Sequence, residues 1–342
     1  MQHQMNSNQS KSTKKNNKEK LLWAFLIGLC SISLSCEEPA EPQFSLAVQW
    51  PSLSEEFQLG NPTGIGVNSE DQIVVFHRAS REWQYPMPET NIGEATILTL
   101  DQQTGTIIHE WGSDTFVMPH GLEVDHQDHI WVTDVALHQV FKFNAEGELL
   151  LKLGEERVAG DDSAHFNLPT DVAVSKDGSF YVSDGYGNSR VVKFSKEGEF
   201  LIQWGELGDE DGQFVIPHGI DLDDEGNVYV ADRENNRIQK FTADGVHLKT
   251  WQNETTNQLY SLVVDQSAKR VYGIDYYVLN DSIVLGSDIF ELDLELNKLN
   301  QFGRSTDYNG PIARYHDIAV DADGNLYTGD ILGNTIQKFE KK

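Results

Sequence analysis

The sequence predicts an all-β fold, a six-bladed β-propeller that spans residues 44–342. A short apolar segment with a Pro-like turn recurs six times, with the turn at positions 62, 119, 169, 217, 260 and 315. Each copy is followed by a tight turn and more short apolar runs. Four short strands repeated with a period of about 40–55 residues are typical of propeller blades.

The four strands of each blade can be followed in the sequence. The first strand corresponds to the segments NPTGIGV, MPHGLEV, LPTDVAV, IPHGIDL, LYSLVVD and RYHDIAV. The second strand follows a turn such as Asp-Gly and ends near an acid, as in IWVTD, FYVSD and VYVAD. The third reads HQVFKF, SRVVKF or NRIQKF, and the fourth ends in an aromatic residue, as in GEFLIQWG. Asp-Gly turns join antiparallel strands, so each copy predicts one antiparallel sheet.

The last repeat is one strand short, and the missing strand is found near the N-terminus. Blade six begins near Arg314 and has three strands before Lys342, whereas FSLAVQW at residues 44–50 has the apolar run ending in Trp that a fourth strand shows. We expect this segment to complete blade six, because closure of the ring removes the exposed sheet edges.

The first 36 residues predict export. Five lysines among residues 1–20 precede a 14-residue apolar run at residues 21–34, too short for a bilayer span of about 20 residues but typical of a secretory signal. The run ends in SLSC, which resembles a bacterial lipoprotein signal with Cys36 as the lipidated residue; a plain secretory signal cleaved nearby is the alternative. Residues 37–43 would then form a tether, and the chain would be a cell-envelope lipoprotein that contacts membrane only through its lipid.

Composition excludes several classes of function. With 54 acidic and 26 basic residues, the net charge is −28, which argues against binding to nucleic acid. The only cysteines, Cys30 and Cys36, belong to the signal, so the folded domain has no disulfide, thiol nucleophile or thiolate metal site. We expect a monomer.

Histidine recurs in one column of the repeat. The third residue of the opening segment is His in blades two, four and six, and Thr or Ser in the others. Alternate blades of a six-fold ring bring His120, His218 and His316 together from three directions, with a fourth coordination position free. Such a set suits a catalytic Zn²⁺, with Fe²⁺, Co²⁺ and Cu²⁺ left open. The alternative is that these Pro-His turns are only part of the repeat's structure.

Two arginines and a tyrosine follow the second strands. Arg78 and Arg233 come directly after these strands in blades one and four, and Tyr186 lies one position further along in blade three. Arginine binds carboxylates bidentately, and a tyrosine next to a cation and a metal can have a lowered pKa and act in proton transfer. The alternative for Arg233 is an ion pair with a carboxylate of a neighbouring blade.

These motifs resemble a known family. VFHRASREW, VTDVALHQVFKF, VSDGYGNSR and IPHGIDLDDEGNVYVADRENNRIQKF are similar to the peptidyl-α-hydroxyglycine amidating lyases, which are built of NHL repeats. The resemblance covers about residues 60–340 and implies a metal-dependent lyase that converts a peptidyl-α-hydroxyglycine, or a similar small α-hydroxy-amide, into an amide and glyoxylate.

The resemblance also implies roles for individual residues. His120, His218 and His316 would hold zinc, Tyr186 would take the substrate's hydroxyl proton, and Arg78 and Arg233 would orient its carboxylate. A structural Ca²⁺ would be bound by the backbone carbonyls of Ile65 and Leu122 and by the carboxylate of Asp317.

Three positions depart from the family, and two other functions compete with the lyase. Gly187 stands where animal members have a disulfide cysteine, and Arg314 and Tyr315 stand where a methionine precedes the last zinc ligand. A propeller hydrolase or lactonase would favour acidic and Asn ligands on the axis. A non-catalytic NHL propeller that binds peptide, glycan or protein has no reason to retain the His, Tyr and Arg set, and the fold alone does not choose among these functions.

Overall fold

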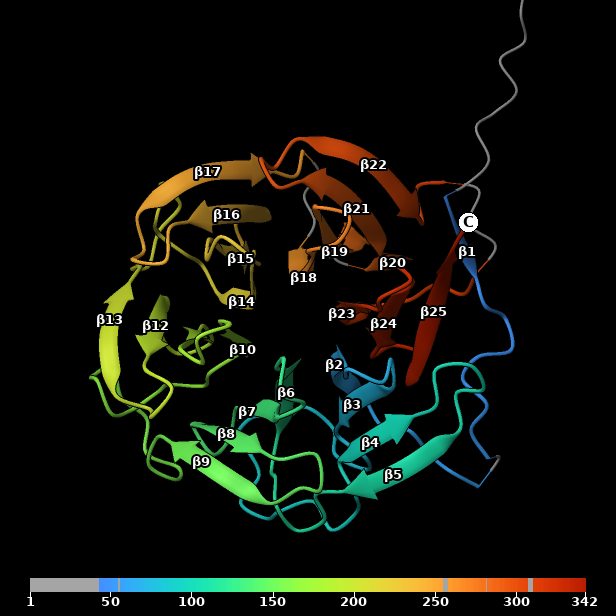
Figure 1. Cartoon of the computed structure of the whole chain (residues 1–342), viewed down its shortest axis with the longest axis horizontal. Helices are drawn as coiled ribbons and strands as arrows, with labels where there is room; N and C mark the ends of the chain where they lie inside the picture. Colours follow the sequence, from blue (N-terminus) through green and yellow to red (C-terminus); the bar gives the residue numbers. More distant parts are fainter. Residues whose placement is uncertain (1–42, 55, 255–257, 281, 307–309) are drawn as a thin grey trace, which may run out of the picture. The chain divides into compact units, whose positions relative to one another are not determined.

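The computed structural model describes residues 43–342, apart from residues 55, 255–257, 281 and 307–309. The predicted signal and residues 37–42 of the tether lie outside the described residues. Within the described part, the chain forms β-strands and no α-helix, so it offers no helical segment that could cross a bilayer. Six antiparallel sheets surround a common axis in a ring, and this confirms the predicted six-bladed propeller (Figure 1).

The blades follow one another along the chain, each with its first strand nearest the axis (Figure 1). Blade one consists of β2 (Pro62–Val67), β3 (Ile73–His77), β4 (Ile97–Leu100) and β5 (Ile107–Trp111). Blade two consists of β6 (Pro119–Val124), β7 (Ile130–Asp134), β8 (Gln139–Phe143) and β9 (Leu149–Leu153). Blade three consists of β10 (Asp171–Val174), β11 (Phe180–Asp184), β12 (Arg190–Phe194) and β13 (Phe200–Trp204).

The remaining blades contain the two departures from a plain four-strand repeat. Blade four consists of β14 (Pro217–Leu222), β15 (Val228–Asp232), β16 (Arg237–Phe241) and β17 (His247–Gln252). Blade five consists of β18 (Gln258–Asp265), β19 (Arg270–Leu279), β21 (Asp288–Asp293) and β22 (Lys298–Gly303), and the additional β20 (Ile283–Gly286) pairs with β19. Blade six consists of β23 (Tyr315–Val320), β24 (Leu326–Asp330), β25 (Thr335–Lys341) and β1 (Phe44–Leu46).

The N-terminal strand closes the ring, as predicted, but it is shorter than residues 44–50. β1 pairs antiparallel with β25, and Leu46 lies opposite Phe339. The strand ends there because the chain turns through Val48 and Gln49. Trp50 still contributes to closure, since its buried ring packs edge-on against Tyr327 at 5.2 Å.

The hydrophobic core lies between the blades. One apolar cluster separates each neighbouring pair of sheets, for example Phe76 and Phe116 against Phe141, or Trp131 against Phe180 and Val182. The second strands are covered on both faces, and β3, β7, β11, β15 and β24 are buried over their whole length. This two-sided burial explains why these strands read as continuous apolar runs, and it makes the axis a rigid frame for side chains.

Candidate metal centre and active site

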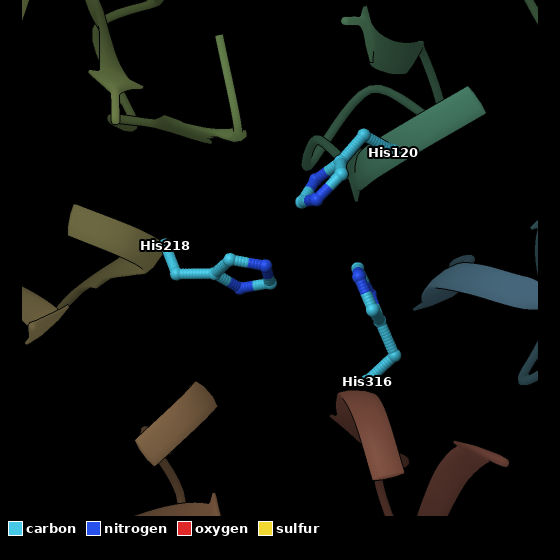
Figure 2. Close-up of side chains that lie close together, drawn as sticks. All are labelled: His120, His218 and His316. Carbon is cyan, nitrogen blue, oxygen red and sulfur yellow. The ribbon is translucent and has the colours of Figure 1, made fainter. Parts of the chain in front are cut away.

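The three histidines of the repeat column lie at β-bulges in the first strands. In blades two, four and six, the strand register shifts at His120, His218 and His316. A bulge leaves its residue outside the ladder and redirects the side chain, often beside an active site. The three imidazoles converge on the axis (Figure 2), with ring centres 4.6–4.9 Å apart and at most 4% of each residue exposed.

The backbone of the next blade sets the tautomer of each histidine. Each Nδ1 faces a backbone carbonyl oxygen, which can only accept, so each Nδ1 carries the proton. The contacts are His120 to Thr170 (2.6 Å), His218 to Tyr260 (2.8 Å) and His316 to Thr63 (2.8 Å). Burial holds the pKa of all three well below the usual value, and the rings are therefore neutral.

Neutral rings protonated on Nδ1 present three Nε2 lone pairs to one point. The candidate ligand atoms lie within 4.8 Å of one another. A backbone acceptor behind a metal-binding histidine is the usual way to fix its orientation. Three imidazole ligands with a position left for water or substrate suit a catalytic divalent metal such as Zn²⁺. The donor set therefore fits the metal that the sequence predicts.

Tyr186 extends from blade three onto the histidines. Its hydroxyl oxygen lies 3.0 Å from Nε2 of His120 and 3.1 Å from Nε2 of His218, and Arg233 Nη1 donates to it at 3.2 Å. Burial raises the pKa of Tyr186, and the nearby Arg233 and Arg78 oppose this shift without overcoming it. Among the protein's own groups, desolvation outweighs the two cations, and the lowered pKa expected beside a cation and a metal stays a prediction.

Arg78 is a buried cation without a carboxylate partner in the described part of the chain. It is 3% exposed, its Nε donates to the carbonyl of Pro119 at 3.0 Å, and its guanidinium lies over the Trp83 ring at 4.9 Å. Burial lowers its pKa to about 10, although Tyr186 and Asp134 act in the opposite direction. Arg78 remains charged at neutral pH and is free to bind an anion.

Arg233 faces the same tyrosine from the other side. Its guanidinium lies 5.2 Å from the ring of Tyr186 and 5.3 Å from that of Tyr260, and it pairs with Glu234 at 2.8 Å. The carboxylate thus comes from the next residue in the chain and not from another blade. Burial disfavours the charge of Arg233, but Tyr186, Tyr260 and Glu234 together raise its pKa.

Three neighbours complete this site: the sequence reasoning missed Tyr260 and Trp83, and it identified Arg314 only as a departure from the family. Tyr260 packs against His218 and His316 at 5.1 and 5.7 Å, Arg314 lies over Tyr260 at 5.2 Å, and Trp83 packs against Tyr186 at 5.2 Å. A signal for Tyr260 was present, because it replaces the Pro of the opening segment in blade five. Trp83 belongs to the long β3–β4 connection, which lies outside the repeat pattern; its signal was the motif VFHRASREW, which ends at this residue.

A second group of titratable residues lines a cavity of about 380 Å³ further along the same strands. Ile65, Leu122 and Asp317, the residues expected to bind calcium, all line it. Asp317 accepts hydrogen bonds from the backbone of Ile65 at 2.8 Å and from the hydroxyl of Ser261 at 2.7 Å. The structure thus brings the expected carboxylate to the axis, beside the strands that supply the two expected carbonyls.

Six further acids line this cavity, and three of them have no ion-pair partner among the described residues; the sequence reasoning did not identify these three. They are Glu123, Asp171 and Asp221. Burial raises the pKa of each of these acids, as it does for Asp317. The pKa is raised to about 7 for Asp221 and to about 6 for Asp317. The only Lys or Arg among the lining residues is Lys176, which pairs with Asp224. The signal was again a column, since Asp171 and Asp317 share the fourth position of the opening segment, and Glu123 and Asp221 share the sixth.

One oxygen of this acidic group indicates a missing partner. Asp171 is 8% exposed, and its Oδ2 accepts from the backbone of Ile220 at 3.1 Å, whereas its Oδ1 has no hydrogen-bond donor among the described residues. A buried carboxylate oxygen without a donor is costly. Four buried acids that have no ion-pair partner among the described residues, Asp171 included, fit a hard divalent cation such as Ca²⁺, which prefers oxygen ligands.

Comparison with known proteins gives a consistent set of relatives. The NHL repeat model matches residues 166–194 and 214–241, in blades three and four. Peptidyl-glycine alpha-amidating monooxygenase B of Xenopus laevis is 37% identical over 317 residues, with 85% of this chain and 35% of the relative covered. The chain spans about a third of the length of the amidating monooxygenases that it matches.

A shorter relative is matched over most of both chains. A Caenorhabditis elegans protein named "Probable peptidyl-alpha-hydroxyglycine alpha-amidating lyase pgal-1" is 34% identical over 296 residues, with 80% of this chain and 81% of the relative covered. Among solved structures, virginiamycin B lyase from Staphylococcus aureus has a TM-score of 0.56 at 17% identity, with 87% of this chain and 88% of that chain covered. At this identity the structural likeness shows a shared fold alone.

Proposed function

The chain belongs to the peptidyl-α-hydroxyglycine α-amidating lyase family, and we propose that it cleaves the C–N bond of a peptidyl-α-hydroxyglycine or a similar α-hydroxy-amide. The products are an amide and glyoxylate. The observation that carries this proposal is the contact of the Tyr186 hydroxyl with Nε2 of His120 and His218 and with Arg233, because it joins a proton-transfer group to a metal-ligand set and a cation.

In this proposal, His120, His218 and His316 hold the metal, with zinc as the expected ion. When bound, the ion supplies a Lewis acid that makes the substrate hydroxyl more acidic, and its charge adds to that of the arginines in favouring the phenolate form of Tyr186. Arg78 and Arg233 orient the carboxylate of the hydroxyglycine, as the buried and unpaired guanidinium of Arg78 allows.

One residue, Tyr186, is enough to carry out both proton transfers of the reaction. Tyr186 takes the proton of the substrate hydroxyl, the oxygen forms a carbonyl with its carbon, and the C–N bond breaks. The departing amide nitrogen receives a proton from Tyr186, which restores the starting state. No electron acceptor and no water are consumed. The rings of Trp83 and His120, which pack against Tyr186 at 5.2 Å each, hold the phenol in place during both transfers.

The decisive test combines metal content with glyoxylate release from benzoyl-α-hydroxyglycine. We expect about one zinc per chain and a rate that falls at least a hundredfold in Tyr186→Phe, with zinc retained, because general acid–base catalysis typically contributes that much. Tyr181→Phe is the matched control, since that hydroxyl lies in the same blade and donates to the carbonyl of Ala243 at 3.2 Å. Metal without glyoxylate release from wild type would contradict the lyase proposal.

At the other group of acids, we propose a structural Ca²⁺ bound by Asp317 and by the carbonyls of Ile65 and Leu122. Its support is the acidic cavity and the unpartnered Oδ1 of Asp171. Calcium should raise the melting temperature of chelator-treated protein, whereas magnesium should do so much less, because Mg²⁺ dehydrates reluctantly. A melting temperature that does not respond to calcium would contradict this assignment.

We also propose that residues 1–36 export the chain and that Cys36 becomes lipidated. The support is the basic start, the short apolar run and the SLSC ending. Mass spectrometry of the mature protein from a bacterial host should find a diacylglyceryl-modified Cys36, and Cys36→Ser should release the protein from the membrane fraction. A mature N-terminus at another residue would indicate the plain secretory signal instead.

A further inference from the structure

A third arginine faces the histidine site, and neither the repeat nor the proposed reaction uses it. Arg314 lies two residues before His316. Its backbone nitrogen donates to Oδ1 of Asp330 at 2.8 Å, and its carbonyl accepts from the nitrogen of Ile331 at 2.9 Å. The backbone of Arg314 is therefore fixed to the edge of blade six, close to a metal-ligand residue.

Two tyrosine rings hold the Arg314 guanidinium in position. It lies over Tyr276 at 4.5 Å and over Tyr260 at 5.2 Å, and one of its terminal nitrogens donates to the Tyr260 hydroxyl. Stacking on aromatic rings orients an arginine while its remaining N–H groups stay free for a planar anion. Its Nε is buried and has no hydrogen-bond acceptor within the part of the chain that the structure describes. The side chain is thus ordered before any ligand arrives.

The charges around the site are not balanced. Arg78, Arg233 and Arg314 surround the histidines, yet in the described part of the chain only Arg233 has a carboxylate at ion-pair distance, Glu234 at 2.8 Å. The chain as a whole carries a net charge of −28, so unpaired guanidinium groups in one cluster stand out against an acidic protein. Two free guanidinium groups attract more than one anionic group.

The spacing of the arginines suits two anionic groups on one small molecule. Arg233 and Arg314 both lie against Tyr260, because each guanidinium carbon lies within 5.3 Å of the centre of its ring. They are therefore at most about twice that distance apart. In a hydroxyglycine amide of aspartate or glutamate, the two carboxylates are separated by roughly 6–9 Å, from standard bond lengths.

We propose that Arg314 binds a second carboxylate of the substrate and makes the enzyme selective for dianionic α-hydroxy-amides. This inference rests on the proposed function and deepens it. The hydroxyglycine carboxylate binds at Arg78 and Arg233, and the side-chain carboxylate of an acidic residue that precedes the hydroxyglycine binds at Arg314. Arg314 is a specificity-determining residue here and takes no part in proton transfer.

The test compares N-acetyl-glutamyl-α-hydroxyglycine with N-acetyl-glutaminyl-α-hydroxyglycine, which has the same shape and one charge less. For wild type, we expect kcat/KM to favour the glutamyl substrate at least tenfold, mainly through KM, as a charge-assisted bidentate contact allows. Arg314→Met should abolish this preference and change the glutaminyl rate less than threefold. Arg314→Lys should retain part of it, since it keeps the charge and loses the fork of N–H donors.

Arg270→Met is the matched control. Arg270 begins strand β19, six residues before Tyr276, and pairs with Glu291 at 3.0 Å away from the histidines. This variant should keep the wild-type preference. Equal rates for the two substrates in wild type, or an equal loss for both in Arg314→Met, would overturn the proposal. The second result would mean that Arg314 binds the hydroxyglycine carboxylate itself or supports the fold.

A binding measurement separates this proposal from the lyase proposal. Calorimetry with the uncleavable dipeptides N-acetyl-Glu-Gly and N-acetyl-Gln-Gly needs no catalysis. A tenfold preference of wild type for the glutamyl dipeptide that disappears in Arg314→Met supports the dianion site even if no substrate releases glyoxylate. No preference in this assay, with glyoxylate released from both hydroxyglycine substrates, would overturn the dianion site and leave the lyase intact.

Discussion

Two regions of the propeller axis are built from the same first strands and have opposite electrostatics. The histidine region presents three neutral imidazoles among the three arginines Arg78, Arg233 and Arg314, whereas the acidic cavity presents four carboxylates without a lysine or arginine partner on its lining. Both suit a divalent cation, but for different reasons. In the first the cation activates a ligand among other positive charges, and in the second it offsets repulsion between like charges.

The difference follows from position within one repeat segment. The third residue of the segment lies at a bulge and reaches the axis beside the loops that carry Arg78, Tyr186 and Arg233. The fourth and sixth residues reach the axis further along the strands, and the described residues that line the cavity there include no arginine. Positions only one to three residues apart along a strand thus belong to different sites, the histidine region with its proposed catalytic metal and the acidic cavity with its proposed structural metal.

Loss of one imidazole should have the largest effect, and only on the histidine region. In His218→Ala we expect zinc content to fall close to zero and glyoxylate release to fall by about a thousandfold or more, because two ligands do not retain the ion. Calcium stabilisation should remain. His109→Ala, an exposed histidine on β5, is the control. Full zinc content in the His218 variant would show that zinc does not bind at the three histidines.

A substitution that weakens ring closure should lower the stability of the whole propeller and leave both regions equally intact in the folded protein. Trp50→Ala removes a buried ring that packs on Tyr327 and should cost about 3–5 kcal/mol in the free energy of unfolding. Denaturant unfolding measures this loss. Zinc content and calcium response should persist below the lowered transition, because the first strands remain paired within their own blades. Loss of one metal site but not the other in the folded variant would contradict a common frame.

Substitution of Arg78 should change activity and stability in opposite directions. Burial lowers its pKa to about 10, below its value in the unfolded chain, so both states carry the charge at neutral pH and the full cost of burying it is present. Arg78→Met should therefore raise the melting temperature while kcat/KM for benzoyl-α-hydroxyglycine falls about 10- to 100-fold. A lower melting temperature would mean that the hydrogen bond to Pro119 outweighs the burial of charge.

Neutral substitutions in the acidic cavity should have the smallest effect. Glu123→Gln combined with Asp221→Asn removes two buried carboxyls whose pKa is raised by burial and whose burial therefore destabilises the fold at neutral pH, so the melting temperature in chelator should rise by roughly 2–4 °C, the shift expected for about 1 kcal/mol. Calcium should then add less stability than in wild type. Glyoxylate release should stay within a factor of two. A fall in activity that matches the His218 variant would show that the two regions act as one site.

Much of the fold was predictable because it is encoded locally. Turn residues and apolar runs recur within each blade, so the blade number, the strand order and closure by residues near Phe44 could be read directly. The end of β1 at Leu46 could not, because it depends on a turn that resembles a continuing apolar strand in sequence. The convergence of His120, His218 and His316 was predictable for the same reason as the fold, since symmetry converts one repeat column into a ring.

What only the tertiary structure decided depends on contacts between blades. The carbonyls of Thr63, Thr170 and Tyr260 set the histidine tautomers from neighbouring blades, although up to 253 residues separate the partners in the chain. Desolvation, which no short motif reports, raises the pKa of Tyr186 against two cations. The sequence alone determined which side chains meet on the axis, because that depends on periodicity; burial and inter-blade packing determined their protonation, pairing and free charge.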